Sequence, residues 1–406
     1  MLQFQCDYNE GAHPKVMQRL LETNMEQTVG YGEDHYCESA RRLIQEACGN
    51  PDLQVHFLVG GTQTNTTVIA HLLRPHQGVV AAESGHISVH ETGAIEHTGH
   101  KVLALPAHEG KITAAQVENL VLEHRADSSF EHTVQPRMVY ISFPTEFGTL
   151  YTKAELETLH EVCRKYELPL FIDGARLGYG LASPTCDVTL SDIAHLADVF
   201  YIGGTKVGAL FGEAVVSKSH ALMRDFRYSI KQHGGMLAKG RLLGLQFEAL
   251  FTDNLYFNIA RHAVSEALRI KEALLDLGVP FLMESHTNQQ FVVLTEAQME
   301  QIGRRHIFEY NAKVGEGLHI ALHKVLLLQE GRSLVRPADE VGRGGFHEIL
   351  KVAVENRGRT GKSHALLIKA DLAGFRLGKM GQKTAGRLFE IGTLFLPLVG
   401  IGTDGP

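Results

Sequence analysis

The sequence contains no tryptophan and only five cysteines among its 406 residues. The cysteines are an odd number without close pairs, which argues against a disulfide framework and favours reduced thiols in the cytoplasm. They are Cys6, Cys37, Cys48, Cys163 and Cys186. No uninterrupted apolar run reaches the roughly 18 residues of a membrane span. The first seven residues lack the charged and apolar segments of a secretion signal, so secretion is not expected.

Basic charge is also scarce. Lys and Arg number 39 against 46 Asp and Glu, a formal net charge of -7. This excess of acidic groups argues against a nucleic-acid or anionic-membrane partner for the chain as a whole. The hydrophobic fraction of 44% is enough for one large core or two ordinary ones. We therefore expect a soluble globular protein.

Short apolar runs alternate with helix-like stretches over the first half of the chain. The runs are 55–59, 79–82, 101–105, 138–143, 169–172, 199–202 and 214–216. Most are bounded by Gly, Pro or Asp, which predicts strands of an α/β fold with a largely parallel sheet. Ligands gather at the carboxyl ends of such strands. Polar residues directly after these runs are therefore the first candidates for a functional site.

The pattern changes after Gly240. The elements expected beyond it are helices over 242–251 and 256–277, a strand over 290–295 and an amphipathic helix over 297–308. We predict a large domain over residues 1–245 and a smaller α+β domain over residues 246–318.

The last 88 residues, 319–406, have a different composition. They hold 13 Lys and Arg against 8 Asp and Glu, whereas the residues before them hold 26 against 38. This basic, Gly-rich tail follows neither the helical nor the strand period. Two interpretations stay open, a nucleic-acid-binding arm and an ill-ordered or foreign C-terminal segment.

Lys206 follows a strand pattern and stands among small residues, in the stretch Asp198–Ala209. Partial burial lowers the pKa of a lysine amine, which is the condition for Schiff-base chemistry. By itself, a lysine after a strand also fits a solvated strand end.

Asp173 ends a very apolar strand pattern, and Arg176 follows three residues later. A helix-capping aspartate with a structural arginine would explain the pair. A buried carboxylate also needs a cationic partner. Together with Lys206, Asp173 fits an anion that keeps a pyridinium nitrogen protonated.

Glycines and hydroxyls join a strand to a helix in the segment Val59–Asn65, which contains Gly60, Gly61 and Thr62. Free backbone N–H groups and the helix dipole make such a junction a phosphate cradle. The segment matches neither the dinucleotide fingerprint nor the P-loop, so a mononucleotide-like phosphate is the expected ligand.

His86 and His90 stand four residues apart after another strand pattern. This spacing is typical of zinc ligands on one helix face, but the His-Glu-x-x-His order is missing. Surface histidines are a second possibility. We favour His86 as a stacking or acid-base imidazole and expect no metal.

In chain order, these segments resemble the threonine aldolase branch of the fold type I pyridoxal-phosphate enzymes, which includes β-eliminating lyases. The resemblance covers about residues 1–318 and rests on six stretches: Asp7 with Gly11–Pro14, Gly30–Asp34, Gly60–Thr62 with Asn65, His86 with Glu91–Ala94, Asp173–Leu177 and Gly204–Lys206. It implies an aspartate-aminotransferase-like large domain with a mostly parallel sheet and pyridoxal 5'-phosphate as the cofactor.

The resemblance also implies one role for each of four side chains around the cofactor: Lys206 as its covalent anchor, His86 stacked on its ring, Asp173 at the ring nitrogen and Arg176 near its phenolic oxygen or the substrate carboxylate. Gly61 and Thr62 would bind its phosphate. Tyr31, with Lys231 or Lys239, would reach in from a neighbouring subunit.

A protein of this kind would be a cytoplasmic homo-oligomer, a dimer or tetramer, in amino-acid metabolism. It would cleave L-threonine or L-allo-threonine to glycine and an aldehyde by retro-aldol chemistry. Two alternatives stay open. One is β-elimination, and the other is a cofactor-binding assembly partner with impaired catalysis.

Three features depart from the family. The loop Ser142–Glu146 lacks the histidine that many members place near the substrate hydroxyl, which leaves His86, Glu146 or a water as the base. Cys6 stands where relatives commonly have a serine near the substrate carboxylate. The carboxylate-binding arginine that relatives usually carry near the C-terminus is missing. A reading-frame slip near residue 320 or a replaced terminus would explain its loss, and Arg332 or Arg336 would have to substitute for it.

Overall fold

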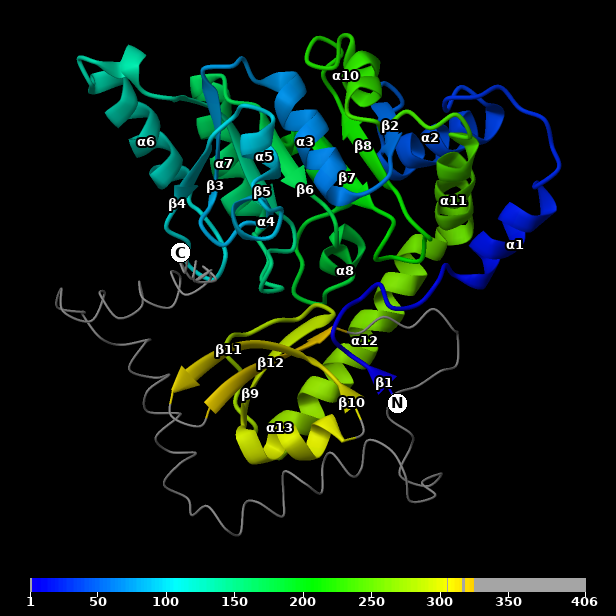
Figure 1. The fold of residues 1–406 in the computed structure, drawn as a ribbon, viewed down its shortest axis with the longest axis vertical. Helices are drawn as coiled ribbons and strands as arrows, with labels where there is room; N and C mark the ends of the chain where they lie inside the picture. Colours follow the sequence, from blue (N-terminus) through cyan, green and yellow to red (C-terminus); the bar gives the residue numbers. More distant parts are fainter. Residues whose placement is uncertain (1, 305, 316–317, 325–406) are drawn as a thin grey trace, which may run out of the picture. The chain divides into compact units, whose positions relative to one another are not determined.

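The computed structural model describes residues 2–304, 306–315 and 318–324, which Figure 1 shows in colour. The basic tail from residue 325 onward lies outside the described residues. Arg332, Arg336 and all of the basic, Gly-rich segment 319–406 except residues 319–324 therefore lie outside the described residues. None of the helices in the described ranges is long and apolar enough to cross a membrane.

A seven-stranded sheet forms the core of the larger part, in the order β2-β8-β7-β6-β5-β3-β4. The strands are β2 (Gln54–Leu58), β3 (Gln77–Ala82), β4 (Val102–Leu105), β5 (Gln135–Ser142), β6 (Leu170–Asp173), β7 (Val199–Gly203) and β8 (Glu213–Ser217). β3 is parallel to β4 and β5, and β6 is parallel to β5 and β7. Only β8 runs antiparallel to its neighbours, β7 and β2. The predicted α/β fold with a mostly parallel sheet is confirmed, and each of the seven predicted runs forms a strand.

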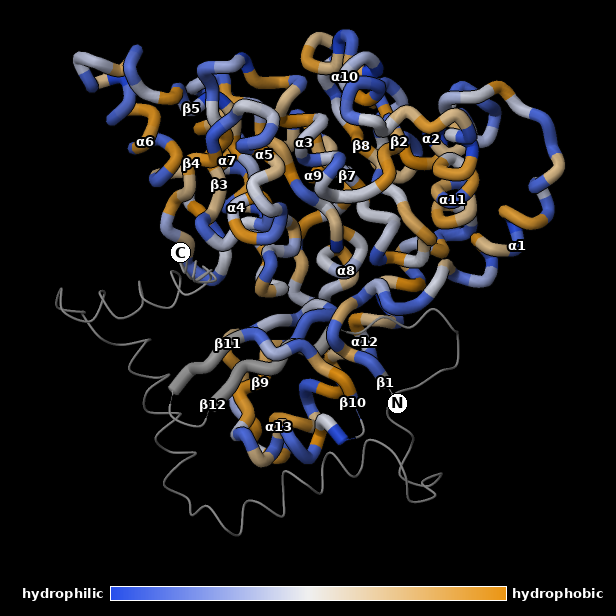
Figure 2. Tube along the Cα trace, viewed as in Figure 1, coloured by the Kyte–Doolittle hydropathy of each residue, from blue (hydrophilic) through white to orange (hydrophobic). Residues whose placement is uncertain are grey.

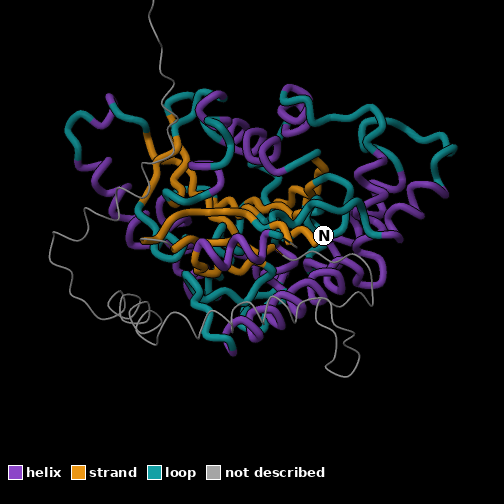
Figure 3. Tube along the Cα trace, turned by 60° about the horizontal axis from the view of Figure 1, so that its bottom comes forward, coloured by secondary structure: helices purple, strands orange, loops and turns teal. Residues whose placement is uncertain are grey.

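Alternate residues of each strand belong to two different cores, one on each face of the sheet. In β3, for example, Val79 and Ala81 belong to one core and Val80 and Ala82 to the other. Successive side chains of a strand point to opposite faces, so both faces must be covered by helices. Figure 2 shows apolar residues along these strands, and Figure 3 shows helices on both sides of them.

Two groups of helices cover the two faces. One core includes residues of α2 (His35–Cys48), α6 (Ala114–Ala126), α7 (Lys153–Tyr166) and α9 (Leu190–Leu196). The other includes residues of α3 (Gly61–Leu72), α4 (His86–Val89), α5 (Ala94–His97) and α10 (Phe226–Gln232). The first core extends to α11 (Arg241–Phe251) and α12 (Leu255–Asp276), the two helices predicted after Gly240. The remaining helical elements of the larger part are α1 (Pro14–Glu22), α8 (Leu177–Leu181) and the short turns η1 (Phe130–His132) and η2 (Thr252–Asn254).

Local sequence determines where several helices begin. Three helices are each preceded by a threonine, namely Thr113, Thr152 and Thr189. The side chain of the threonine accepts a hydrogen bond from the backbone N–H three residues later, and the side chain of that later residue accepts one from the threonine backbone N–H. Such capping boxes satisfy two backbone donors that a helix start leaves unpaired. At the other end of α2, Gly49 adopts a left-handed conformation with φ of 70°, as the residue that ends a helix often does.

The smaller part contains two short sheets and the end of α12. β9 (Gln289–Thr295) pairs antiparallel with β12 (Leu318–Lys324), which pairs antiparallel with β11 (Glu309–Gly315). β1 (Leu2–Gln3) pairs with β10 (His306–Ile307). α13 (Glu296–Gly303) lies between β9 and β10. The predicted helix over 297–308 is therefore too long, because residues 306–307 form a strand with the N-terminal segment.

The predicted domain limits fall inside elements of the structure. The limit at 245/246 lies within α11, which packs along α2 of the larger part. The limit at 318 lies at the start of β12, which continues the small sheet to Lys324. A small core of its own joins α12, β9 and α13, and it includes Ile270, Leu274, Val292, Leu294 and Ile302. The division into domains stays a prediction.

Candidate active site

A cavity of about 290 Å³ lies where several strands end. β2, β3, β5, β6 and β7 run in one direction, so their carboxyl ends meet at the same edge of the sheet. Seven predicted site residues line the cavity: Gly61, Thr62, His86, Glu146, Asp173, Arg176 and Lys206. They come from segments spread over some 145 residues of sequence, which only the sheet topology brings together.

Asp173 ends β6 and is only 4% exposed. One carboxylate oxygen accepts hydrogen bonds from the Tyr140 hydroxyl at 2.5 Å and the Asn65 amide at 3.1 Å. The other accepts from the Tyr201 hydroxyl and from the backbone N–H of Ala175. Burial opposes ionisation, but the charge of a neighbouring imidazole and these donors together lower the pKa of Asp173 below its ordinary value. The cavity therefore has an anion on its wall.

Lys206 follows β7 and lines the same cavity. Burial and the nearby Arg176 guanidinium lower the pKa of its amine. A larger fraction of the amine is therefore neutral, and a neutral amine is the nucleophile. Its backbone is also held, because the Tyr179 hydroxyl donates a hydrogen bond to the Lys206 carbonyl. Lys206 and Asp173 therefore line the same cavity.

Arg176 forms a two-pronged ion pair with Asp7. Its Nε lies 2.6 Å from Asp7 Oδ2 and its Nη2 lies 2.9 Å from Asp7 Oδ1. The amide of Asn288 donates to the same carboxylate at 2.9 Å. Asp7 is fully buried, and despite this burial the Arg176 charge lowers the pKa of its carboxyl well below the ordinary range. Asp7 therefore stays charged and fixes the orientation of the guanidinium plane.

His86 begins α4 and bonds through Nδ1 to the Glu91 carboxylate at 2.8 Å. Glu91 Oε1 also accepts from the Asn65 amide at 2.8 Å, so one chain of hydrogen bonds links His86 to Asp173. Burial opposes protonation, but the hydrogen bond to Glu91 and the charge of Asp173 raise the pKa of His86. No group of three His, Cys, Asp or Glu residues suitable for a metal ion occurs in the described part of the chain.

Two further carboxylates line the cavity, Glu146 and Glu213. Glu146 accepts from the backbone N–H of His86 at 2.9 Å and from the Ser142 hydroxyl at 2.5 Å. Glu213 accepts from the Thr205 hydroxyl at 2.8 Å and from the Gly204 N–H at 3.2 Å. Burial raises the pKa of both groups, that of Glu213 to about 8.

The start of α3 forms another wall of the cavity. Gly60 precedes the helix, and because it has no side chain, none of the first backbone N–H groups is capped by it. Gly60, Gly61 and Thr62 line the cavity. The first N–H groups of a helix have no partner within it, and the helix dipole favours an anion there. A Cβ on Gly61 would lie 3.3 Å from the Tyr201 hydroxyl, so a glycine keeps this corner open. The predicted phosphate cradle therefore faces the same cavity as Lys206.

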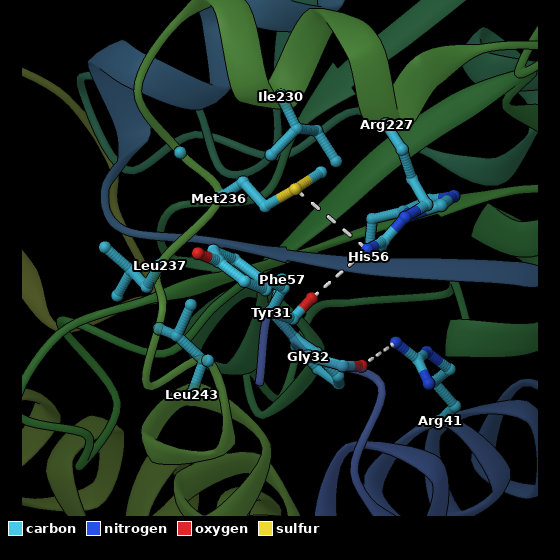
Figure 4. Close-up of a pocket in the computed structure, with 12 residues that line it drawn as sticks. Tyr31, Gly32, Arg41, His56, Phe57, Arg227, Ile230, Met236, Leu237 and Leu243 are labelled. Atoms are coloured by element: carbon cyan, nitrogen blue, oxygen red, sulfur yellow. Dashed lines mark hydrogen bonds between the residues drawn. The ribbon is translucent and has the colours of Figure 1, made fainter. Parts of the chain in front are cut away.

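Four predicted residues, Cys6, Tyr31, Lys231 and Lys239, do not line this cavity. Cys6 bonds to Asn9, with its Sγ 2.6 Å from Oδ1. Tyr31 lines a separate, small pocket that Figure 4 shows, together with Arg227 and Met236. Neither Lys231 nor Lys239 lines either pocket, but the Nζ of Lys231 lies 5.1 Å from the centre of the Tyr31 ring.

Sequence reasoning did not identify several residues of the site. Tyr140 and Tyr201 were expected only as strand residues, and their role depends on β5 and β7 flanking β6. Glu213 stands at the start of an antiparallel strand, where no site residue was expected. Asp7 was part of the resemblance, but its pairing with Arg176 spans 169 positions of the sequence. The contacts of these residues depend on which strands and segments become neighbours in the fold, which the local sequence does not specify.

The sequence matches the family model described as β-eliminating lyase over residues 3–297. It is 30% identical to the low-specificity L-threonine aldolase of Pseudomonas aeruginosa over 318 residues, which cover 78% of this chain and 90% of that protein. The threonine aldolase of Leishmania major has a similar structure, with a TM-score of 0.80 and 41% identity, over 87% of this chain and 99% of that one.

More distant structures share the fold alone. An aspartate aminotransferase variant of Thermus thermophilus superposes with a TM-score of 0.60 at 13% identity, over 88% of this chain and 91% of the other. The fold expected for the large domain is therefore confirmed.

Proposed function

The chain belongs to the β-eliminating lyase family, and from this premise we propose that it is a pyridoxal-phosphate-dependent aldehyde-lyase. Its substrates are threonine or allo-threonine, which it cleaves into glycine and an aldehyde. The observation that carries the proposal is the single cavity lined by Lys206, Asp173 and the start of α3. The similarity to threonine aldolases over most of the chain supports the same reaction.

The residues of the cavity fit pyridoxal phosphate. An uncapped helix start suits a phosphate group, and a buried amine with a lowered pKa suits an aldehyde.

Each group of the cofactor has a partner in this proposal. Lys206 holds the aldehyde, Asp173 pairs with the ring nitrogen, and His86 lies against the ring. Gly61 and Thr62 bind the phosphate. When bound, the cofactor supplies an electron sink for the negative charge that develops on the substrate Cα. Asp173 supports this sink because its charge is kept by four hydrogen bonds.

Arg176 is the proposed partner of the substrate carboxylate. Asp7 engages its Nε and Nη2, while its Nη1 makes no hydrogen bond to the described residues. A guanidinium held in one plane loses little freedom when it binds a carboxylate. Arg176 therefore supports substrate binding without the C-terminal arginine that the family usually carries.

The cleavage itself needs two proton movements. A base takes the proton of the β-hydroxyl, the Cα–Cβ bond breaks, and its electron pair stays on Cα while the carbonyl of the aldehyde forms. A proton then returns to Cα to give glycine.

The proposed enzyme is a homo-oligomer. Exposed apolar side chains gather on α1 and the segment after it, with Leu21, Met25 and Val29 exposed by 73, 88 and 67%. Such a patch marks an interaction surface. We assign it to a homo-oligomer interface, dimer or tetramer, and place Tyr31 and Lys231 beside the neighbouring copy. The proposed location is the cytoplasm.

The test uses purified protein loaded with pyridoxal phosphate. L-threonine or L-allo-threonine should yield glycine and acetaldehyde, followed as NADH consumption with alcohol dehydrogenase. The Lys206→Ala variant should lose both this activity and the visible absorbance band of the bound cofactor, because no amine remains to hold the aldehyde. Lys101→Ala, which removes an exposed lysine, is the matched control and should keep both.

Other outcomes would favour the alternatives. Pyruvate and ammonia from serine, without aldehyde from threonine, would show a β-eliminating enzyme. Cofactor binding without either reaction would show a catalytically impaired protein. A Lys206→Ala variant with wild-type activity would contradict the proposed site.

A further inference from the structure

The loop after β5 brings one carboxylate, that of Glu146, to the cavity. The loop is tied in place at several points. The hydroxyls of Thr145 and Thr149 lie 2.5 Å apart, and the N–H of Thr145 bonds to the carbonyl of Thr149 at 3.0 Å. The amide of Gln289 donates to the Glu146 carbonyl at 3.4 Å. The position of the carboxylate is therefore set by the surrounding structure.

The two oxygens of Glu146 have different surroundings. Oε1 accepts hydrogen bonds from the backbone N–H of His86 and from the Ser142 hydroxyl. Oε2 accepts none from the described residues, and it is not among the buried atoms that lack a partner. Because Glu146 lines the cavity, Oε2 is open to whatever binds there. One oxygen anchors the group, and the other is available as an acceptor.

The other two carboxylates that line the cavity lack an available oxygen. Asp173 accepts four hydrogen bonds, two at each oxygen. Glu213 accepts at both oxygens, from the Thr205 hydroxyl at one and from the Gly204 N–H at the other. Neither carboxylate therefore has an oxygen without a hydrogen-bond donor, as Glu146 has.

His86 is engaged with another carboxylate. Its Nδ1 bonds to Glu91, whose side chain is fully buried, and this pairing raises the pKa of the imidazole. His86 is therefore suited to contact the cofactor ring and to orient Glu146 through its backbone N–H.

Charged and titratable groups surround Glu146 on several elements. They are His86 at the start of α4, Asp173 at the end of β6, Arg176 before α8, Tyr140 on β5 and Tyr151. Burial raises the pKa of Glu146, and the charge of Asp173 acts in the same direction, while the Ser142 hydroxyl and His86 oppose it. A carboxylate with a raised pKa is a stronger base than an exposed one.

We propose that Glu146 is the catalytic base for the β-hydroxyl of the substrate. This inference rests on the proposed aldolase function. Oε2 takes the hydroxyl proton as the Cα–Cβ bond breaks, so Glu146 becomes a carboxylic acid and the aldehyde leaves neutral. The electron pair stays on Cα, and the stored proton returns to solvent before the next turnover.

The test compares two reactions of the same holoenzyme. Cleavage of threonine requires the hydroxyl base, whereas exchange of the glycine α-proton with D2O, followed by NMR, requires only the cofactor site. In Glu146→Gln, kcat for threonine cleavage should fall by about 10²- to 10⁴-fold, the usual range for a general base. Glycine exchange and cofactor affinity should stay near wild type. Glu157→Gln, which changes an exposed carboxylate on α7, should leave all three unchanged.

Two further readouts separate catalysis from a structural role. The rise of kcat/KM with pH should occur above the ordinary range of a glutamate and should vanish in Glu146→Gln. In the cofactor-free protein, the infrared carbonyl band of protonated carboxyls should lose one titrating component in Glu146→Gln, whereas the component that belongs to Glu213 should remain. Glu146→Asp keeps a carboxylate and should recover part of the cleavage rate.

Three results would overturn the inference. The first is a Glu146→Gln variant that cleaves threonine within about 10-fold of the wild-type rate. The second is a parallel loss of cleavage, glycine exchange and cofactor binding, which would mark a structural residue. The third is a wild-type protein that exchanges glycine but cleaves no β-hydroxy amino acid, which would remove the aldolase function itself.

Discussion

A buried carboxylate keeps its charge only where donors replace the water that it has lost. Asp173 has four such donors, whereas Glu213 has two and Glu146 has two on a single oxygen. The protonation of each group follows from its own surroundings, although all three line one cavity. At the scale of single residues, the site is therefore a set of carboxylates with different proton affinities.

Replacing Glu213 with Gln should change how stability depends on pH. Its pKa of about 8 in the folded chain lies above the ordinary 4.5. Between these two values the unfolded chain has lost the proton and the folded chain has kept it, so stability falls as pH rises. The measurement is urea unfolding of the cofactor-free protein at several pH values. Between pH 4.5 and about 8, the free energy of unfolding of Glu213→Gln should rise relative to that of the wild type, by at most ~1.4 kcal/mol per pH unit. If the free energies of unfolding of the two proteins changed in parallel with pH, the raised pKa of Glu213 would be contradicted.

Close packing of elements supports the site from outside. Contacts between α2 and α11 join the first 50 residues to the chain beyond Gly240. Gly244 makes this approach possible, since a Cβ there would lie 2.6 Å from the Cα of Cys37. No side chain fits at such a distance, so the position demands glycine for a steric reason and not for its backbone freedom.

The variant Gly244→Ala should be less stable than the wild type. Alanine favours a helix over glycine by about 1 kcal/mol, but the overlap with Cys37 should outweigh this gain and give a net loss of ~1–3 kcal/mol. The free energy of unfolding in urea measures it. Gly303→Ala, in α13 with nothing within 4 Å of the added Cβ, is the control and should be neutral or slightly stabilising. Equal stability of the two variants would show that α2 and α11 separate easily.

At the scale of the whole molecule, exposed apolar surface is concentrated on α1 and the chain after it. This surface is the proposed contact with a second copy. Tyr31 follows it with a φ of 62°, a conformation that a bulky residue rarely adopts. The Lys231 amine lies near the Tyr31 ring, so both groups would be held at the edge of the interface.

The variant Met25→Asp should weaken the oligomer. A charge buried in an apolar interface without a partner costs about 3 kcal/mol or more, roughly a 100-fold weaker association. Sedimentation velocity over a range of concentrations would show the smaller species. Leu122→Asp, on α6 and 47% exposed, is the matched control and should sediment as the wild type. A Met25→Asp protein with unchanged sedimentation would place the interface elsewhere.

The amino-acid sequence by itself determined the elements and the cofactor chemistry. Each predicted strand run became a strand, because a short uninterrupted apolar run can bury the side chains of both its faces in a sheet covered on both sides. Lys206, Asp173 and the glycine-rich start of α3 were recognisable because each follows a strand, and parallel strands bring such positions to one edge.

Only the tertiary structure decided the proton affinities and the long-range partners. The pairs Arg176 with Asp7 and Asp173 with Tyr140 depend on which segments become neighbours, which no local pattern specifies. The helix predicted to Phe308 ended early for the same reason, since His306 and Ile307 pair with the N-terminal strand. Burial and pairing arise from the packed chain, and they set the charge of each group in the cavity.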